Sequence, residues 1–335
     1  MRVAVIAALL AFVLFALPGM LSLYWIDVST SVAIYSVVAL GLGILIGRTG
    51  LVSLGQIAVL ALGAWVAARL LFATGLPFPI VLAMSGLITM VLGTLVGLPA
   101  LRLSGLYLAL ITLMLAGAIT VALRATNFPN GGHGFLGHTE ETFGIKSVRR
   151  PDIAISDPAY FRYTVVVAAV MFLLALLHIR AKPGRAWAAI RQSEPAALAA
   201  GVNITLYKLW AFALASFMTG VAGALLAANV GQLFVLQFPT SDSIVLLAVV
   251  LMGGIYSLWG AIVAGLLMQL LPALLDSWGL PADLLTILFG VGVLQVLTTA
   301  PAGLAYQFPR DMARLGKLIA GLFRRAIPPA RERAG

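Results

Sequence analysis

Long apolar runs separated by short polar stretches recur along almost the whole chain, and this pattern constrains the fold more than any other feature. Hydrophobic residues make up 62% of the 335 residues and charged residues only 10%, with a mean hydropathy of +1.08. This composition lies far outside the range of ordinary soluble domains. The sequence therefore predicts an all-α polytopic membrane protein, since helices satisfy their own backbone hydrogen bonds in lipid.

The apolar runs predict about ten transmembrane segments. The first resembles a secretory signal, but it lacks a small-x-small cleavage site and further segments follow at once, so we expect it to remain as a helix. Several segments are shorter than the roughly 20 residues that cross a bilayer, so we expect some to be broken or re-entrant. The segments lie near residues 1–20, 32–46, 54–73, 80–99, 106–123, 163–179, 209–228, 243–254, 257–275 and 284–300.

The distribution of charge predicts the orientation, because Lys and Arg gather in short cytoplasmic loops. With the N-terminus inside, the cytoplasmic side carries 15 of the 21 basic residues and 3 of the 11 acidic ones. An inverted chain would place the basic excess outside. We therefore expect both termini to be cytoplasmic.

This topology divides the chain into a transmembrane domain, residues 1–309, and a basic cytoplasmic tail, residues 310–335. The spaced apolar residues of the tail are compatible with a helix on anionic lipid or with a frayed end. Two connections are long: an outer loop at residues 124–162 and a cytoplasmic loop at residues 180–208. Long ordered loops are often functional.

The cytoplasmic loop contains a helical segment with polar edges at residues 184–201. Ser193 is suited to cap a short helix, Pro195 fits its first turn, and Gly201 can close it in the left-handed conformation. The segment has the character of a docking element for another protein, although a solvated loop helix remains an alternative.

The outer loop is rich in Gly, Pro and Asn, and it lies where an extracytoplasmic partner would arrive. We expect its central residues to contact such a partner or to border the entrance. His133 and His138 lack a third ligand, so we expect no metal. The candidate contact residues are Asn130, Gly131, Gly132, His133 and Phe135.

Several chemistries are missing from the chain. No acidic residue lies between Asp27 and Glu140, and none falls at the middle of a predicted span, which disfavours a carrier driven by protons or sodium. No phosphate-binding loop and no catalytic triad are present, so the chain is not expected to be an enzyme or to bind ATP. Its basic residues lie at helix ends without interleaved aromatics, which disfavours nucleic acid. Any active transport therefore requires energy from a partner.

Hydroxyl and amide side chains in the apolar spans are candidates for a solute pathway. Such groups are better satisfied in a cavity or against another helix than in lipid, and hydrogen bonding between helices is the equally weighted alternative. Glycine-rich runs at residues 50–55 and 253–260 are expected to be broken-helix entrances. The pathway candidates are Ser53, Gln56, Tyr107, Thr112 and Ser257.

Several motifs in order resemble one family. They are GLVSLGQIA from residue 50, GLYLALITL from residue 105, the loop from Gly184 to Asn203, YKL from residue 207, GVAGA from residue 220 and GGIYSLWG from residue 253. Together they are similar to permease subunits of ATP-binding cassette importers of the branched-chain amino-acid type, in particular the larger of the two permeases. The resemblance covers about residues 31–300.

The resemblance implies that residues 184–201 form the loop that couples the permease to its ATPase. It implies a bacterial inner-membrane complex with a second permease in a heterodimer, two ATPase subunits that bind ATP and Mg, and a periplasmic solute-binding protein. The chain itself would bind no cofactor. The implied coupling residues are Gly184, Arg185, Arg191, Glu194, Ala196, Ala197 and Gly201.

Departures from the family pattern leave the solute open. Gln56 stands where many relatives have His, Gly117 and Ala118 replace a more polar stretch, and Tyr256 replaces a common Gly. The resemblance favours branched-chain amino acids, with urea, short amides or another small carboxylate as further possibilities. The alternative function is a passive channel or facilitator for a small neutral solute, which would leave the polar loop without a role.

Overall fold

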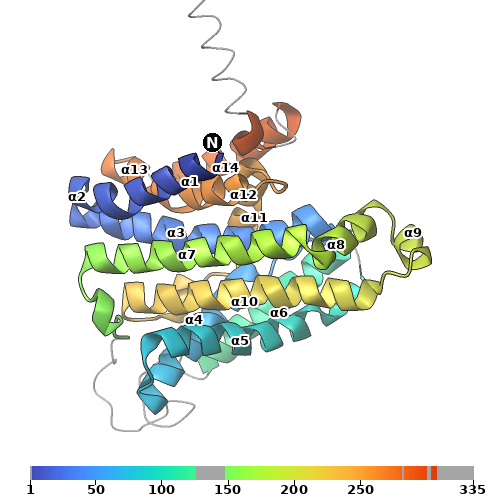
Figure 1. Cartoon of the computed structure of the whole chain (residues 1–335), viewed down its shortest axis with the longest axis horizontal. Helices are drawn as coiled ribbons and strands as arrows, with labels where there is room; N and C mark the ends of the chain where they lie inside the picture. The colour runs from blue at the N-terminus through green and yellow to red at the C-terminus, as the bar shows by residue number, and fades with distance from the viewer. Residues whose placement is uncertain (1, 104, 126–147, 281–282, 300–302, 308–335) are drawn as a thin grey trace, which may run out of the picture.

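The protein is a bundle of helices that run between two ends, as the computed structural model shows (Figure 1). It describes residues 2–103, 105–125, 148–280, 283–299 and 303–307. These residues form helices and contain no strand. The expected all-α bundle is therefore confirmed.

Eight helices among the described residues are long and apolar enough to cross a membrane. Two of the ten predicted segments instead correspond to shorter apolar helices, Ala7–Met20 and Ile287–Val296. The eight spans are Leu23–Thr49, Gln56–Thr74, Phe78–Gly97, Gly105–Ala125, Asp157–Arg180, Ile204–Val230, Val235–Gly253 and Leu258–Ser277.

The first half of the chain forms α1 to α6 with three short π or 3-10 turns. The elements are α1 (Arg2–Ala11), η1 (Phe12–Ala16), α2 (Leu17–Met20), α3 (Leu23–Ile44), η2 (Leu45–Thr49), α4 (Gln56–Thr74), α5 (Phe78–Gly97), η3 (Leu98–Leu101) and α6 (Gly105–Ala125).

The second half contains the remaining long helices and two short polar ones. The elements are η4 (Asp152–Ala154), α7 (Asp157–Arg180), α8 (Lys182–Gln192), α9 (Glu194–Ala199), α10 (Ile204–Val230), η5 (Val235–Gln237), α11 (Asp242–Gly253), α12 (Leu258–Gly265), η6 (Leu266–Leu270), α13 (Leu271–Ser277) and α14 (Asp283–Thr299).

Helix α10 is the centre of the bundle. In its most apolar stretch 94% of the residues are buried, against 28% in α6. It packs most extensively against α5, α4 and α3, and small residues permit this close approach. A Cβ on Gly63 would lie 2.6 Å from the Gly220 Cα, and one on Gly223 would lie 2.4 Å from the Leu60 carbonyl oxygen. The backbones of α4 and α10 therefore touch directly.

Two helices begin earlier than the hydropathy predicted. Helix α3 starts at Leu23 rather than near residue 32, and α7 starts at Asp157 rather than near residue 163. Polar groups at these starts have partners in the fold: Asp27 accepts a hydrogen bond from Asn229, and Asp157 pairs with Arg150. Asn229 lies 202 positions from Asp27 and Arg150 lies 7 positions before Asp157, and a hydropathy pattern reveals neither pairing.

The bundle is interrupted at two places that bear on function. The first break, residues 50–55, separates η2 from α4, and the second break, residues 254–257, separates α11 from α12. Gly50 has a φ of 74° and Gly254 a φ of 110°, which side chains rarely allow. Both expected breaks in helical structure are therefore present. We name the end of the bundle that carries α8 and α9 the α8–α9 end (Figure 1).

Candidate functional site

Helix α8 lies in the polar connection between α7 and α10. A Cβ on Gly184 would lie 1.9 Å from the Ile179 carbonyl oxygen, so the turn out of α7 requires glycine. Trp187 is fully buried, and its indole Nε1 donates a hydrogen bond of 2.8 Å to the Tyr207 carbonyl. These contacts fix the first turns of α8 to α7 and α10.

Helix α9 follows with the capping that the sequence predicts. The Ser193 side chain accepts a hydrogen bond from the Ala196 amide, Pro195 occupies the first turn, and Gly201 closes the segment with a φ of 79°. Ala197 is buried against the bundle and Ala196 is exposed. The expected short helix is confirmed, while the longer α8 before it was not predicted as a separate helix.

Charged residues line the outer side of this connection. Glu194 and Lys208 form an ion pair of 2.8 Å, in which Lys208 is buried and the carboxylate is about half exposed, at 48%. Arg185 is exposed on α8. The surface that faces away from the bundle therefore combines charged groups with the exposed Leu198 of α9.

Arg191, in the last turn of α8, joins three parts of the chain. Its Nη1 donates to the Gly47 carbonyl of η2 at 2.6 Å, and its Nη2 donates to the Tyr256 hydroxyl at 2.6 Å. The guanidinium also lies 4.4 Å from the centre of the Tyr256 ring, within cation–π range. The polar connection thus reaches the second break directly.

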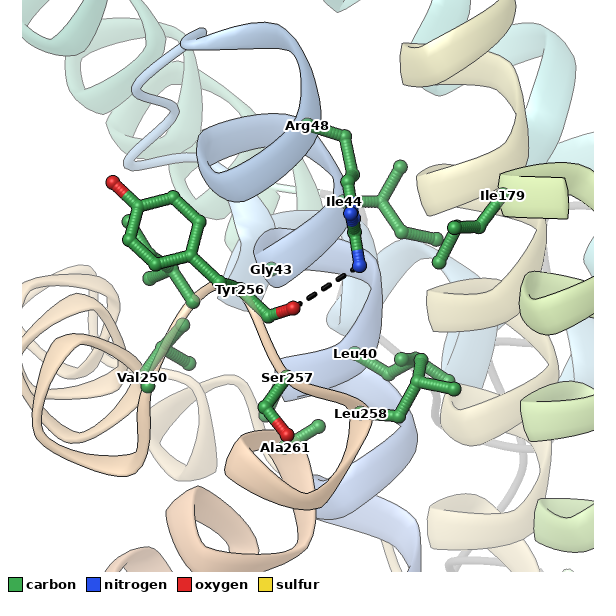
Figure 2. Close-up of a pocket in the computed structure, with 13 residues that line it drawn as sticks. Leu40, Gly43, Ile44, Arg48, Ile179, Val250, Tyr256, Ser257, Leu258 and Ala261 are labelled. Atoms are coloured by element: carbon green, nitrogen blue, oxygen red, sulfur yellow. Dashed lines mark hydrogen bonds between the residues drawn. The ribbon is translucent and has the colours of Figure 1, made fainter. Parts of the chain in front are cut away.

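Arg48 binds the same residue of the second break at its backbone. Its Nη2 donates to the Tyr256 carbonyl at 3.0 Å, as Figure 2 shows. A small pocket of about 20 Å³ lies there, which is room for a single water molecule. Its lining is mostly apolar and includes Leu40, Ile44, Ile179, Val250, Ser257 and Leu258.

The first break is more deeply buried than the second, and nearby side chains supply its hydrogen-bond partners. The Leu54 amide donates to the Thr112 hydroxyl of α6 at 2.9 Å, and the Gly55 amide donates to Ser53 at 3.4 Å. The Gln56 side-chain amide donates to Thr219 of α10 at 2.8 Å. Non-helical backbone at this depth requires such partners, since lipid offers none.

The structure brings three of the five pathway candidates together. Ser53, Gln56 and Thr112 are buried around the first break and hydrogen-bonded, whereas Ser257 lies in the second break and lines the small pocket. Tyr107 stands apart from them on α6 and is 75% exposed. Their contribution to a solute pathway remains a prediction.

Sequence reasoning missed three residues of this region. Trp187 is a lone large aromatic in a polar stretch, which is a detectable sign of an anchored helix. In the sequence, Arg48 is only one of the basic residues that set the membrane orientation. Tyr256 was considered only as a difference from the family pattern that bears on the choice of solute. Their contacts join segments up to 208 positions apart, which local patterns do not encode.

A larger hollow opens at the opposite end of the bundle. It has a volume of about 930 Å³ and lies between the α4–α5 connection and residues 149–153. Arg150 there pairs with Asp157 and lies over the Tyr160 ring, while Arg149 lines the hollow. The predicted contact residues Asn130 to Phe135 and the basic tail lie outside the described residues.

Comparison with known proteins yields two curated relatives. The high-affinity branched-chain amino acid transport system permease protein LivM of Salmonella typhimurium is 33% identical over 277 residues. The LivM protein of Escherichia coli is 32% identical over 271 residues. Each match covers 76% of this chain and 64% of the relative, so the chain spans about two thirds of the length of these proteins. No solved structure matches the chain.

A family model covers most of the chain. The match extends over residues 24–297, which begins just inside α3 and ends within α14, and so includes both breaks and the α8–α9 connection. The chain therefore belongs to the family described as the permease component of branched-chain amino acid transport systems.

Proposed function

We propose that this chain is a permease subunit of an ATP-binding cassette importer in the bacterial inner membrane, and that it carries branched-chain amino acids. The LivM relatives are proteins of high-affinity branched-chain amino acid transport systems, which supports the solute class. The observation that carries the proposal is the α8–α9 connection, whose outer surface carries Arg185 and Glu194 while Arg191 reaches the second break. A passive channel has no use for such a connection.

In this proposal the α8–α9 end is cytoplasmic and receives an ATPase subunit. Helix α8 is anchored by Trp187 and Gly184, α9 is capped at both ends, and Glu194 is paired with Lys208. A rigid, polar and partly exposed pair of helices is suited to fit a groove on another protein. ATP and Mg would bind to the ATPase subunits, and a second permease would complete the membrane part.

The opposite end would receive a periplasmic solute-binding protein. The hollow at this end is lined by Arg149, which follows in the sequence the residues for which we predict such contact, and by residues 75–79 at the α4–α5 connection. Because the chain contains no native cysteine, single cysteines at His133 and His138 can report on this contact. We expect cross-links to the loaded binding protein, whereas free reaction of both cysteines in its presence would count against this contact.

Reconstitution tests the transport proposal. The chain would be purified with the products of the neighbouring permease, ATPase and binding-protein genes and placed in liposomes. We expect uptake of labelled leucine, isoleucine or valine that requires ATP and the binding protein. Downhill entry of urea or acetamide through the chain alone, without ATP, would instead establish the passive facilitator.

A further inference from the structure

The second break is held in place by side chains from other segments. Within residues 254–257 the backbone makes one local turn contact, from the Ser257 amide to the Gly254 carbonyl at 3.3 Å. Its main outside supports are Arg48, which binds the Tyr256 carbonyl, and Arg191, which binds the Tyr256 hydroxyl. The break also bonds to its flanking helices through the Gly254 amide and the Ser257 carbonyl, and its backbone packs closely against Gly47. The side-chain hydrogen bonds that reach Tyr256 from other segments depend on where those two guanidinium groups lie.

Among the described residues, no carboxylate pairs with either guanidinium. In the part of the chain that the structure describes, the ion pairs are Arg150 with Asp157 and Lys208 with Glu194. Arg191 instead holds Tyr256 and the Gly47 carbonyl through neutral acceptors. Such contacts are strong enough to order a loop and weak enough to exchange for water when the geometry changes.

The position of Arg191 on α8 makes these contacts sensitive to movement. The early turns of α8 are fixed by Gly184 and Trp187, whereas Arg191 lies in the last turn. A displacement of 1 to 2 Å of that turn, roughly, would lengthen both 2.6 Å hydrogen bonds beyond the range in which they bind.

We propose that Arg191 and Tyr256 form a latch that holds the second break against the end of α3 and closes the small pocket beside it. Movement of the last turn of α8 releases Tyr256 and opens the pocket at the α8–α9 end. That the ATPase subunit drives this movement rests on the proposed function; the latch itself does not.

A single cysteine can report whether the pocket is open. Val250 is 2% exposed and lines the pocket, so a Val250→Cys chain has one thiol beneath the latch. In inside-out vesicles that contain the complete transporter, we expect a membrane-impermeant maleimide to label this thiol slowly. Added Arg191→Gln or Tyr256→Phe should raise the labelling rate about tenfold, the expected effect of losing one charge-assisted hydrogen bond.

Two controls separate the latch from general loosening. Lys182→Gln removes a positive charge from the same helix at an exposed position and should leave the labelling rate unchanged. The double variant Arg191→Gln with Tyr256→Phe should label no faster than Arg191→Gln alone, because the Tyr256 hydroxyl has already lost its partner once Arg191 is replaced. Tyr256→Phe retains the ring, so normal protein abundance is expected.

Equal labelling in the unaltered Val250→Cys chain and in both variants would overturn the latch, and so would rate increases that multiply in the double variant. The assay requires neither solute nor ATP hydrolysis. If the variants open the pocket while ATP never changes labelling of the unaltered Val250→Cys chain, the latch stands and coupling to an ATPase fails.

Discussion

The first break lies inside the bundle, whereas the second lies at its surface beneath an exposed tyrosine. Residues 50–55 and the adjoining Gln56 receive partners from α6 and α10, with Leu54 bound to Thr112 of α6 and Gln56 bound to Thr219 of α10. Residues 254–257 receive theirs from Arg48 and Arg191, the second of which belongs to the polar connection. Two glycine-rich breaks of similar sequence thus have different mechanical roles.

The difference teaches which break is suited to move. Buried hydrogen bonds at the first break cost much to open, because lipid and apolar side chains replace no lost partner. Contacts at the second break lie at the α8–α9 end, where water can replace them. We infer that the first break is a fixed part of the fold and that the second is the adjustable one.

The largest expected effect comes from the contact that joins the second break to η2. A Cβ on Gly47 would lie 1.9 Å from the Ile255 carbonyl oxygen, so Gly47→Ala forces the second break away from η2. We expect a loss of about 3 kcal/mol in the free energy of unfolding, the upper part of the usual range for overpacking. Thermal unfolding of the purified protein and uptake measure it.

Gly43→Ala is the matched control one helical turn earlier. Its Cβ would lie 4.0 Å from the same Ile255 oxygen, an ordinary contact. We expect a stability change within about 0.5 kcal/mol. Equal stability of the two alanine variants would show that η2 and the second break are not in direct contact.

The next effect concerns the fixed break. Thr112→Val removes the acceptor of the Leu54 amide and leaves a buried donor without a partner. The expected cost is about 2 kcal/mol of stability. Thr120→Val is the control, because the Thr120 hydroxyl bonds only within its own helix, to the Ala116 carbonyl at 3.0 Å. If both valine variants unfold at the same temperature, the first break does not depend on α6.

A smaller effect on stability and a larger one on coupling are expected at Gly201. Its φ of 79° strains any β-branched residue, so Gly201→Val should cost about 1 kcal/mol. The variant should insert normally yet lose ATPase subunits on purification or hydrolyse ATP without uptake. Gly117→Val, at a glycine with open space and no positive φ, should keep both activities. If Gly201→Val takes up solute as the wild type does, residues 184–201 have no coupling role and are better interpreted as a solvated loop.

The smallest effect is expected for Glu194→Gln, which removes the ion pair with Lys208. Because the carboxylate is about half exposed, at 48%, the loss should be at most about 1 kcal/mol and should shrink as salt screens the pair. Unfolding at low and high ionic strength measures the difference from wild type. A loss that is independent of salt would indicate packing rather than charge.

Much of the architecture was predictable because it depends on local patterns. Apolar runs predicted the spans, and Ser193, Pro195 and Gly201 predicted α9, because capping and turn chemistry act within a few residues. Helix α8 was not predicted as a separate element. Its composition is polar on average. Which of its faces is buried is decided by a tertiary contact, the hydrogen bond from Trp187 to the Tyr207 carbonyl of α10.

The sequence by itself determined that this chain is a membrane-embedded helical bundle with a polar connection and two glycine-rich breaks. Only the tertiary structure decided which side chains hold those breaks. Arg48 meets Tyr256 and Leu54 meets Thr112 across 208 and 58 positions of chain. The physical reason is that hydrophobicity acts locally on a helix in lipid, whereas a hydrogen-bond partner is selected by how the helices pack.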